Sequence, residues 1–149
     1  MTSLPNTAAT DPNNPGNTLA SAVDAEIAQF RELQEQLHGL RGDLQVLMGQ
    51  QTENEMVQTE LNLALKDEAI YKRVGPVLVR QELDDAKETV AKRLEFIQKE
   101  QDKLKTKLQS LEQQLQEKGR KIGEMQANMQ RMTAQAVAAI QQQHQAGNS

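Results

Sequence analysis

The sequence predicts a mainly α-helical fold, in which two long helices form an antiparallel coiled coil and a single β-hairpin joins them. Only 37% of the 149 residues are hydrophobic and 2% are aromatic, which is too little for the core of a typical globular domain. Two long stretches repeat apolar residues at alternating steps of three and four, as in a coiled coil. A short run between them is rich in β-branched residues around a Gly-Pro pair, as in a hairpin.

Both ends of the sequence predict disordered tails. Residues 1–18 hold three of the four prolines and little apolar surface to bury. The short segment 144–149 is polar as well. The chain has no run of 18 apolar residues, so no membrane-spanning segment is expected. The first residues lack the basic and apolar regions of a secretory signal, so none is expected.

Residues 19–65 are predicted to form the first helix. Apolar residues occupy nine of the thirteen positions that would face a partner helix, which we call the seam. Glu26 is one polar seam position, and the seam fails at Gln51, Asn54 and Gln58. A single asparagine in a seam can fix the register of a coiled coil, and we hypothesise that Asn54 has this role.

A β-hairpin is predicted over residues 66–81. Its residues alternate, with Ile70, Lys72 and Val74 on one face. The Gly75-Pro76 pair then forms the turn, because glycine adopts positive φ readily and proline donates no hydrogen bond to a ladder. An irregular loop between the two helices is the alternative, although loops rarely carry so many β-branched residues.

Residues 82–143 are predicted to form the second helix, and their heptad pattern is the strongest signal in the sequence. Acidic residues in the first turn suit the helix dipole. Only Gln101 and Lys118 interrupt the apolar seam. No proline breaks this segment.

The hairpin and the end of the second helix are both left without partners by this architecture. An isolated hairpin is marginally stable and has open edges, so oligomerisation through the sheet is expected. Equal rise along both helices places residues whose numbers sum to roughly 148 opposite each other. Residues beyond about 127 then have no partner in the first helix and overhang its end. This Met-rich end either grips partners, since methionine suits adaptable surfaces, or frays or packs against residues 19–27.

No catalytic or metal-binding arrangement is apparent in the sequence. There is no cysteine, and neither His38 nor His144 has a second histidine three or four residues away, as a metal site would need. Phosphate-binding glycine motifs are absent. The net charge of −4 disfavours a nucleic-acid binder. We therefore expect no enzyme activity, no cofactor, and neither nucleic acid nor membrane as a partner.

The hairpin region resembles the β-class subunits of prefoldin. The similarity is carried by Val74-Gly75-Pro76-Val77-Leu78-Val79, Gln81-Glu82-Leu83 and Lys92-Arg93-Leu94, with Thr52-Glu53-Asn54 upstream. The resemblance is clear over about residues 51–98. Among the eukaryotic β-class subunits it is strongest to the sixth, and the second is the next most similar. The N-terminal tail is an addition to the family pattern.

The resemblance implies a hetero-hexameric co-chaperone that works without ATP in the cytoplasm. Two α-class and four β-class subunits would join their hairpins into a double β-barrel, so the partners of this chain would be two α-class and three further β-class subunits. The ends of the coiled coils would hold unfolded actin and tubulin and pass them to the cytosolic chaperonin.

Two sets of residues are assigned to these roles. The assembly residues in the hairpin are Ile70, Tyr71, Val74, Gly75, Pro76, Val77, Leu78 and Val79. The client-binding tip comprises Val23, Ile27, Met125, Met129, Met132, Val137 and Ile140. A structural coiled-coil tether without chaperone activity is the alternative function; it explains the heptads and leaves the hairpin unexplained.

Overall fold

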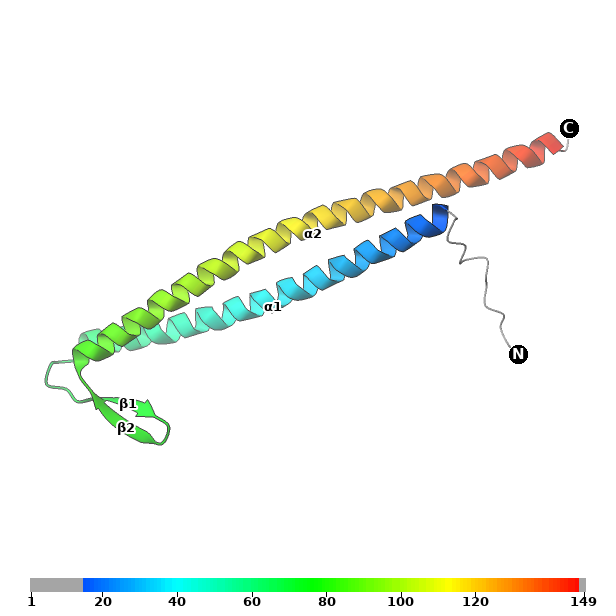
Figure 1. Ribbon diagram of the computed structural model, residues 1–149. Coiled ribbons are helices and arrows are strands. Elements are labelled where there is room, and N and C mark those ends of the chain that lie inside the picture. The colour runs from blue at the N-terminus through cyan, green and yellow to red at the C-terminus, as the bar shows by residue number, and fades with distance from the viewer. Residues whose placement is uncertain (1–14, 148–149) are drawn as a thin grey trace, which may run out of the picture. The chain divides into compact units, whose positions relative to one another are not determined.

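The computed structural model describes residues 15–147, which form two helices and one hairpin (Figure 1). The order is α1 (Pro15–Leu63), β1 (Ile70–Val74), β2 (Val77–Gln81) and α2 (Leu83–Gly147). This confirms the predicted fold class of two long helices with a two-stranded antiparallel hairpin between them. The inter-subunit barrel is a property of an assembly and lies beyond a single chain.

Both helices extend a few residues into the segments predicted to be disordered tails. Helix α1 begins at Pro15 rather than at residue 19, and proline is favoured at a first helical position because the missing N–H has no partner there. Helix α2 continues to Gly147 instead of ending at 143. The rest of the two predicted tails, residues 1–14 and 148–149, lies outside the described residues.

The chain divides into two compact units, each containing part of both helices. One unit takes in α1 up to Gln36 together with α2 from Leu111 onward, and the other comprises Leu37–Ser110 with the hairpin. Within each unit the two helices run antiparallel. The two units are described separately below.

The seam of the coiled coil is the core of each unit. Val23 is buried in the first unit, and Leu37, Val90, Ile97 and Leu108 are buried in the second. Most of the other predicted seam leucines are half-buried, as expected when only two helices share the apolar stripe. Leu65 is an exception, being 69% exposed, because α1 ends at Leu63 and the connection to β1 has already begun.

Polar seam residues pair with each other across the helices. In the second unit Gln101, which is 3% exposed, donates from Nε2 to Oε1 of Gln51 over 2.7 Å. In the first unit Lys118 Nζ lies 2.9 Å from Glu26 Oε2. The predicted register places residue 97 opposite Gln51 and residue 122 opposite Glu26, so each pair lies four residues away from it, in opposite directions. Gln51 and Glu26 of the first seam are therefore paired with the two polar residues that interrupt the second seam.

Asn54 makes a different contact from the one hypothesised. Its Nδ2 donates to the main-chain oxygen of Gln50 in the same helix over 2.7 Å. The cross-helix hydrogen bond in this part of the seam is made by Gln51 instead. The structure thus assigns to Gln51 and Gln101 the register contact that we expected of Asn54.

Candidate functional sites: the hairpin and the end of α2

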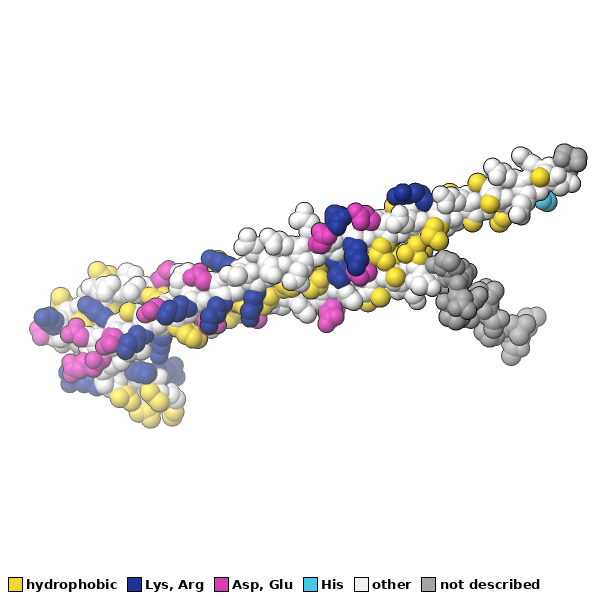
Figure 2. Space-filling view, turned by 45° about the horizontal axis from the view of Figure 1, so that its top comes forward, with side chains coloured by type: hydrophobic (Ala, Val, Ile, Leu, Met, Phe, Trp, Pro, Cys, Tyr) yellow, Lys and Arg dark blue, Asp and Glu magenta, His cyan; other side chains and the backbone are white. Residues whose placement is uncertain are grey.

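The hairpin presents most of its apolar side chains to solvent. Tyr71, Val74, Val77, Leu78 and Val79 are between 48% and 65% exposed. Among the predicted assembly residues only Ile70 is half-buried, and Gly75 and Pro76 are exposed at the turn. Figure 2 shows hydrophobic side chains gathered on the hairpin. Exposed apolar surface gathered in this way marks an interaction surface.

The turn of the hairpin follows from its two residues. Val74 pairs with Val77, so that Gly75 and Pro76 alone form the loop. Gly75 has φ of 60°, and no other described residue has positive φ. The proline ring holds φ of Pro76 near −65°. Positive φ followed by negative φ is the pattern of a type II′ turn, which matches the twist of the flanking strands.

The two faces of the hairpin differ in chemistry. The register places Val74 opposite Val77 and Lys72 opposite Val79, so these residues share a largely apolar face with Ile70. The other face pairs Tyr71 with Arg80, and Arg73 with Leu78. Neither strand contains a carboxylate. The hairpin is therefore both apolar and basic.

The C-terminal end of α2, residues 131–147, is exposed along its whole length. Figure 1 shows it continuing past the beginning of α1. Of the residues assigned to the client-binding tip, Met132, Val137 and Ile140 lie in this end and are 41%, 48% and 66% exposed. No described residue of α1 covers them.

The other tip residues are less accessible. Ile27, Met125 and Met129 are half-buried between the helices. Val23 is only 5% exposed and packs in the core of the coil. Met129 also lines a shallow hollow on α2 together with Gln126, Gln130, Thr133 and Ala134. The accessible apolar surface at this end thus comes from α2.

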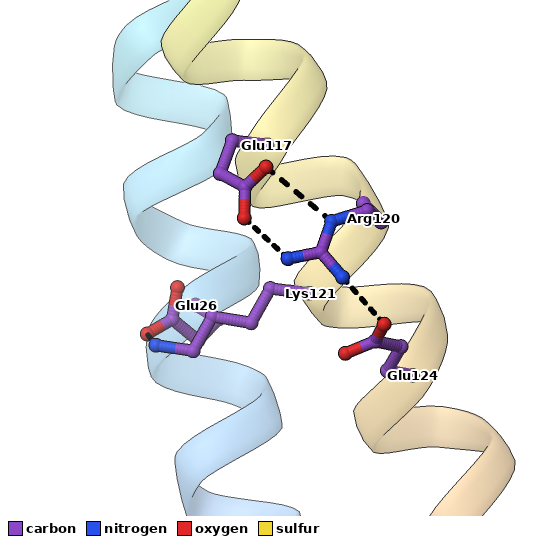
Figure 3. Close-up of polar contacts among 5 residues, drawn as sticks. All are labelled: Glu26, Glu117, Arg120, Lys121 and Glu124. Atoms are coloured by element: carbon purple, nitrogen blue, oxygen red, sulfur yellow. Dashed lines mark hydrogen bonds and ion pairs between the residues drawn. The ribbon is translucent and has the colours of Figure 1, made fainter.

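A cluster of charged residues lies just before this end, in the same unit (Figure 3). Glu26 on α1, which is 15% exposed, accepts from Lys118 and Lys121 of α2 over 2.9 and 3.1 Å. Arg120 pairs with Glu117 and Glu124 of its own helix. Through Glu26 the cluster ties α1 to α2.

The cluster shifts the pKa of three of its members, Glu26, Glu117 and Arg120. The hydrogen bond from Lys118, followed by that from Lys121, lowers the pKa of Glu26 below its ordinary value of 4.5. The hydrogen bond from Arg120 likewise lowers the pKa of Glu117. The same pairing raises the pKa of Arg120.

The lowered pKa of Glu26 predicts a pH-dependent contribution to stability. A carboxyl group whose pKa is lowered by folding contributes its full stabilisation at pH values above its unfolded-state pKa. This contribution is lost as the pH falls through its folded-state pKa. Glu26→Gln should therefore lower the thermal unfolding midpoint at pH 7, and the difference from wild type should shrink below about pH 4.5. Thermal unfolding followed by circular dichroism between pH 7 and 3 measures this.

The matched control is Glu35→Gln, an exposed glutamate in the same part of α1. It should follow the wild-type curve at every pH. Equal midpoints for Glu26→Gln and wild type at pH 7 would contradict the stabilising role of the cluster.

A metal centre is not found among the described residues. No three His, Cys, Asp or Glu side chains among them are grouped closely enough to hold a metal ion. His38 and His144 are both exposed. As for a lipid bilayer, neither described helix contains a stretch apolar enough to cross one. The notable surfaces are those that could bind other proteins.

Comparison with known proteins decides the family. Residues 24–136 match the prefoldin subunit family model. The chain belongs to the prefoldin subunit family. Prefoldin subunit 6 of Bos taurus is 35% identical over 117 residues, covering 78% of this chain and 91% of the relative. The probable prefoldin subunit 6 of Caenorhabditis elegans is 36% identical over 124 residues, covering 78% and 98%.

A solved prefoldin structure has the same fold. The prefoldin beta2 subunit from Thermococcus strain KS-1 is similar with a TM-score of 0.55 and 24% identity. The similarity covers 62% of this chain and 98% of that one. It confirms two long helices joined by a hairpin as a prefoldin β-subunit architecture.

Prefoldin membership confirms the resemblance inferred from the hairpin sequence and supports a co-chaperone role. It also implies other prefoldin subunits as partners. Prefoldin subunits are chaperone-type proteins and are generally not enzymes. Sequence reasoning missed the cross-seam pairs Gln51–Gln101 and Glu26–Lys118, because the predicted register places each residue four positions away from its actual partner.

Proposed function

We propose that this chain is one subunit of a hetero-hexameric prefoldin, with two α-class and three further β-class partners, that holds unfolded actin- and tubulin-like clients. It acts without ATP in the cytoplasm and delivers its clients to the cytosolic chaperonin. The observation that carries the proposal is the exposed C-terminal end of α2, an apolar helix surface that no described residue of α1 covers.

The chemistry of this end suits unfolded clients. Beyond Arg131 the sequence contains no lysine, arginine, aspartate or glutamate, so recognition there depends on apolar contact rather than on charge. Met129 and Met132 have flexible, polarisable side chains that adapt to different apolar partners. Val137 and Ile140 add branched aliphatic surface. A surface of this kind binds many sequences weakly.

Assembly would turn weak contacts into useful affinity. When several weak sites are linked, the second binding event has a high effective concentration, and overall affinity rises by about 10²–10⁴-fold. The hairpin supplies the means of assembly, because its edges and its exposed apolar face are completed only by other strands. The proposed holding mechanism is therefore physical and has no chemical step.

Replacing the apolar side chains at the end of α2 tests the proposal. Met129→Gln, Met132→Gln and Ile140→Gln together should reduce suppression of actin or tubulin aggregation by the assembled complex about 10-fold, because each loses apolar surface that burial against a client would remove from water. Glutamine favours helices as methionine does, so α2 should persist. Light scattering of diluted, denatured client measures the effect.

A control variant separates loss of this surface from loss of any exposed apolar group. Met48→Gln with Val46→Gln alters two residues of α1 that are 53% and 61% exposed. It should hold clients like wild type. Unchanged holding by the triple variant in an intact complex would refute the assignment of the client site.

A further inference from the structure

Two adjoining hollows lie at the hairpin end of the Leu37–Ser110 unit. The smaller, of about 180 Å³, is lined by Tyr71 and Lys72 of the hairpin and by residues of both helices that include Val57 and Val90. The larger, of about 610 Å³, is lined by α2 residues that include Lys92 and Phe96, together with Gln50 and Asn54 of α1. Both are bordered by Thr89 and Arg93, so they form one continuous surface, here named the Phe96 groove.

The Phe96 groove exposes apolar surface outside the seam. Phe96 precedes the buried seam residue Ile97 and is 63% exposed. Val57 is 42% exposed and Tyr71 57%. Packing between the two helices does not account for an aromatic ring in solvent, and exposed aromatic groups are typical anchors in protein interfaces.

The Phe96 groove is also basic. Lys72, Lys92 and Arg93 line it, and no carboxylate does. Lys92 does pair with Glu88 beside the groove, but both side chains are more than 60% exposed, and pairs of this kind contribute little. Arg73 and Arg80 add two further cations on the hairpin. This local excess contrasts with the net charge of −4 of the whole chain.

We infer that the Phe96 groove binds an acidic segment of a neighbouring prefoldin subunit, one that places an apolar side chain against Phe96 and carboxylates against Arg93 and Lys72. The inference rests on the proposed assembly and adds to it a second contact beside the hairpin. It extends the exposed hairpin surface without interruption, because Tyr71 and Lys72 belong to both. Complementary charge of this kind suppresses wrong partners, so the groove would help select which subunit lies alongside.

A neighbouring subunit fits the groove better than a client does. Client recognition by the end of α2 uses a surface without charged side chains, whereas three cations line this groove. A fixed partner can place its carboxylates opposite these cations in every complex, and unfolded chains of varied sequence cannot. The occupant is therefore expected to have one defined sequence.

Photocrosslinking in the assembled complex identifies the occupant. The full chain carries p-benzoylphenylalanine in place of Phe96 and is assembled with the other prefoldin subunits of the same organism. Mass spectrometry after irradiation should find crosslinks to one acidic segment of one other subunit. Crosslinks to an added client instead, or none in an assembled complex, would overturn the inference.

Charge reversal tests the groove quantitatively. Arg93→Glu should weaken incorporation of the chain into the complex about 10-fold or more. Lys105→Glu reverses the charge of an exposed lysine of α2 outside the groove and should incorporate like wild type. Arg93→Lys keeps the positive charge and should therefore retain most of the wild-type incorporation, which separates a role of charge from damage to the helix. Wild-type incorporation of Arg93→Glu would overturn the inference.

These experiments separate failure of the groove from failure of the proposed function. If wild-type chain does not join other prefoldin subunits at all, the proposed assembly is wrong and the groove inference falls with it. If wild type assembles and a hairpin variant such as Val77→Asp does not, while Arg93→Glu assembles normally, only the groove inference is wrong.

Discussion

Val77→Asp is expected to abolish incorporation of this chain into a prefoldin complex while leaving its coiled coil folded. Val77 is 57% exposed on the apolar face of the hairpin, so a carboxylate there costs the single chain little. Once partner strands cover that face, the same carboxylate is buried without a partner, which costs about 3–5 kcal/mol. That loss corresponds to about 100-fold or more in affinity.

Val46→Asp is the matched control for this prediction. It makes the same substitution at a valine of similar exposure, 61%, on α1. It should enter the complex as wild type does. Native mass spectrometry of mixtures with the other subunits gives the incorporated fraction, and circular dichroism confirms that both variants keep their helices. Normal incorporation of Val77→Asp would show that the hairpin is not the assembly element.

Gln101→Leu is expected to destabilise the Leu37–Ser110 unit by about 1–3 kcal/mol, although leucine is the residue typical of a seam. The substitution removes the donor that satisfies Oε1 of Gln51 and leaves that half-buried amide facing an apolar side chain. An unsatisfied polar group costs about this much. Urea unfolding of the full chain, followed by circular dichroism, measures the loss.

The double variant Gln51→Leu with Gln101→Leu should recover the lost stability, because removing both partners of a buried hydrogen bond is nearly neutral or stabilising. Its cost should appear in register, since a polar pair in a seam opposes slippage of one helix along the other. Cysteines introduced at facing positions should then form disulfides in more than one register. Destabilisation equal to the sum of the single variants would contradict the coupling of the pair.

The fold was predictable because each element has a local signal of its own. Heptad spacing identified both helices, and the β-branched residues around Gly75-Pro76 identified the hairpin. The bounds were less predictable. Pro15 was assigned to a tail because proline breaks helix interiors, yet it is well tolerated where a helix begins.

Pairing across the two helices was the harder part to predict. The sequence marks Glu26, Gln51, Gln101 and Lys118 equally as interruptions of an apolar pattern. Their complementarity appears only when the two stripes are placed side by side. The tip assignment likewise combined buried Val23 with exposed Ile140, because heptad spacing identifies a stripe without saying where the partner helix stops covering it.

The Phe96 groove was beyond sequence reasoning for a related reason. Its walls come from both helices and both strands, and its basic character results from bringing Lys72 near Arg93. In the sequence Phe96 was one of three aromatic residues and had no assigned role. The combination of an exposed aromatic ring with neighbouring cations emerges only once hairpin and helices are placed together.

The most direct test of the account is the composition of the complex in which this chain is found. The tagged full-length chain is purified gently from its own cells, and the intact mass of the assembly is measured by native mass spectrometry. The chain should be found once in a hexamer of six different small subunits. A homodimer of the chain without other prefoldin subunits would contradict this prediction and would favour a structural coiled-coil tether.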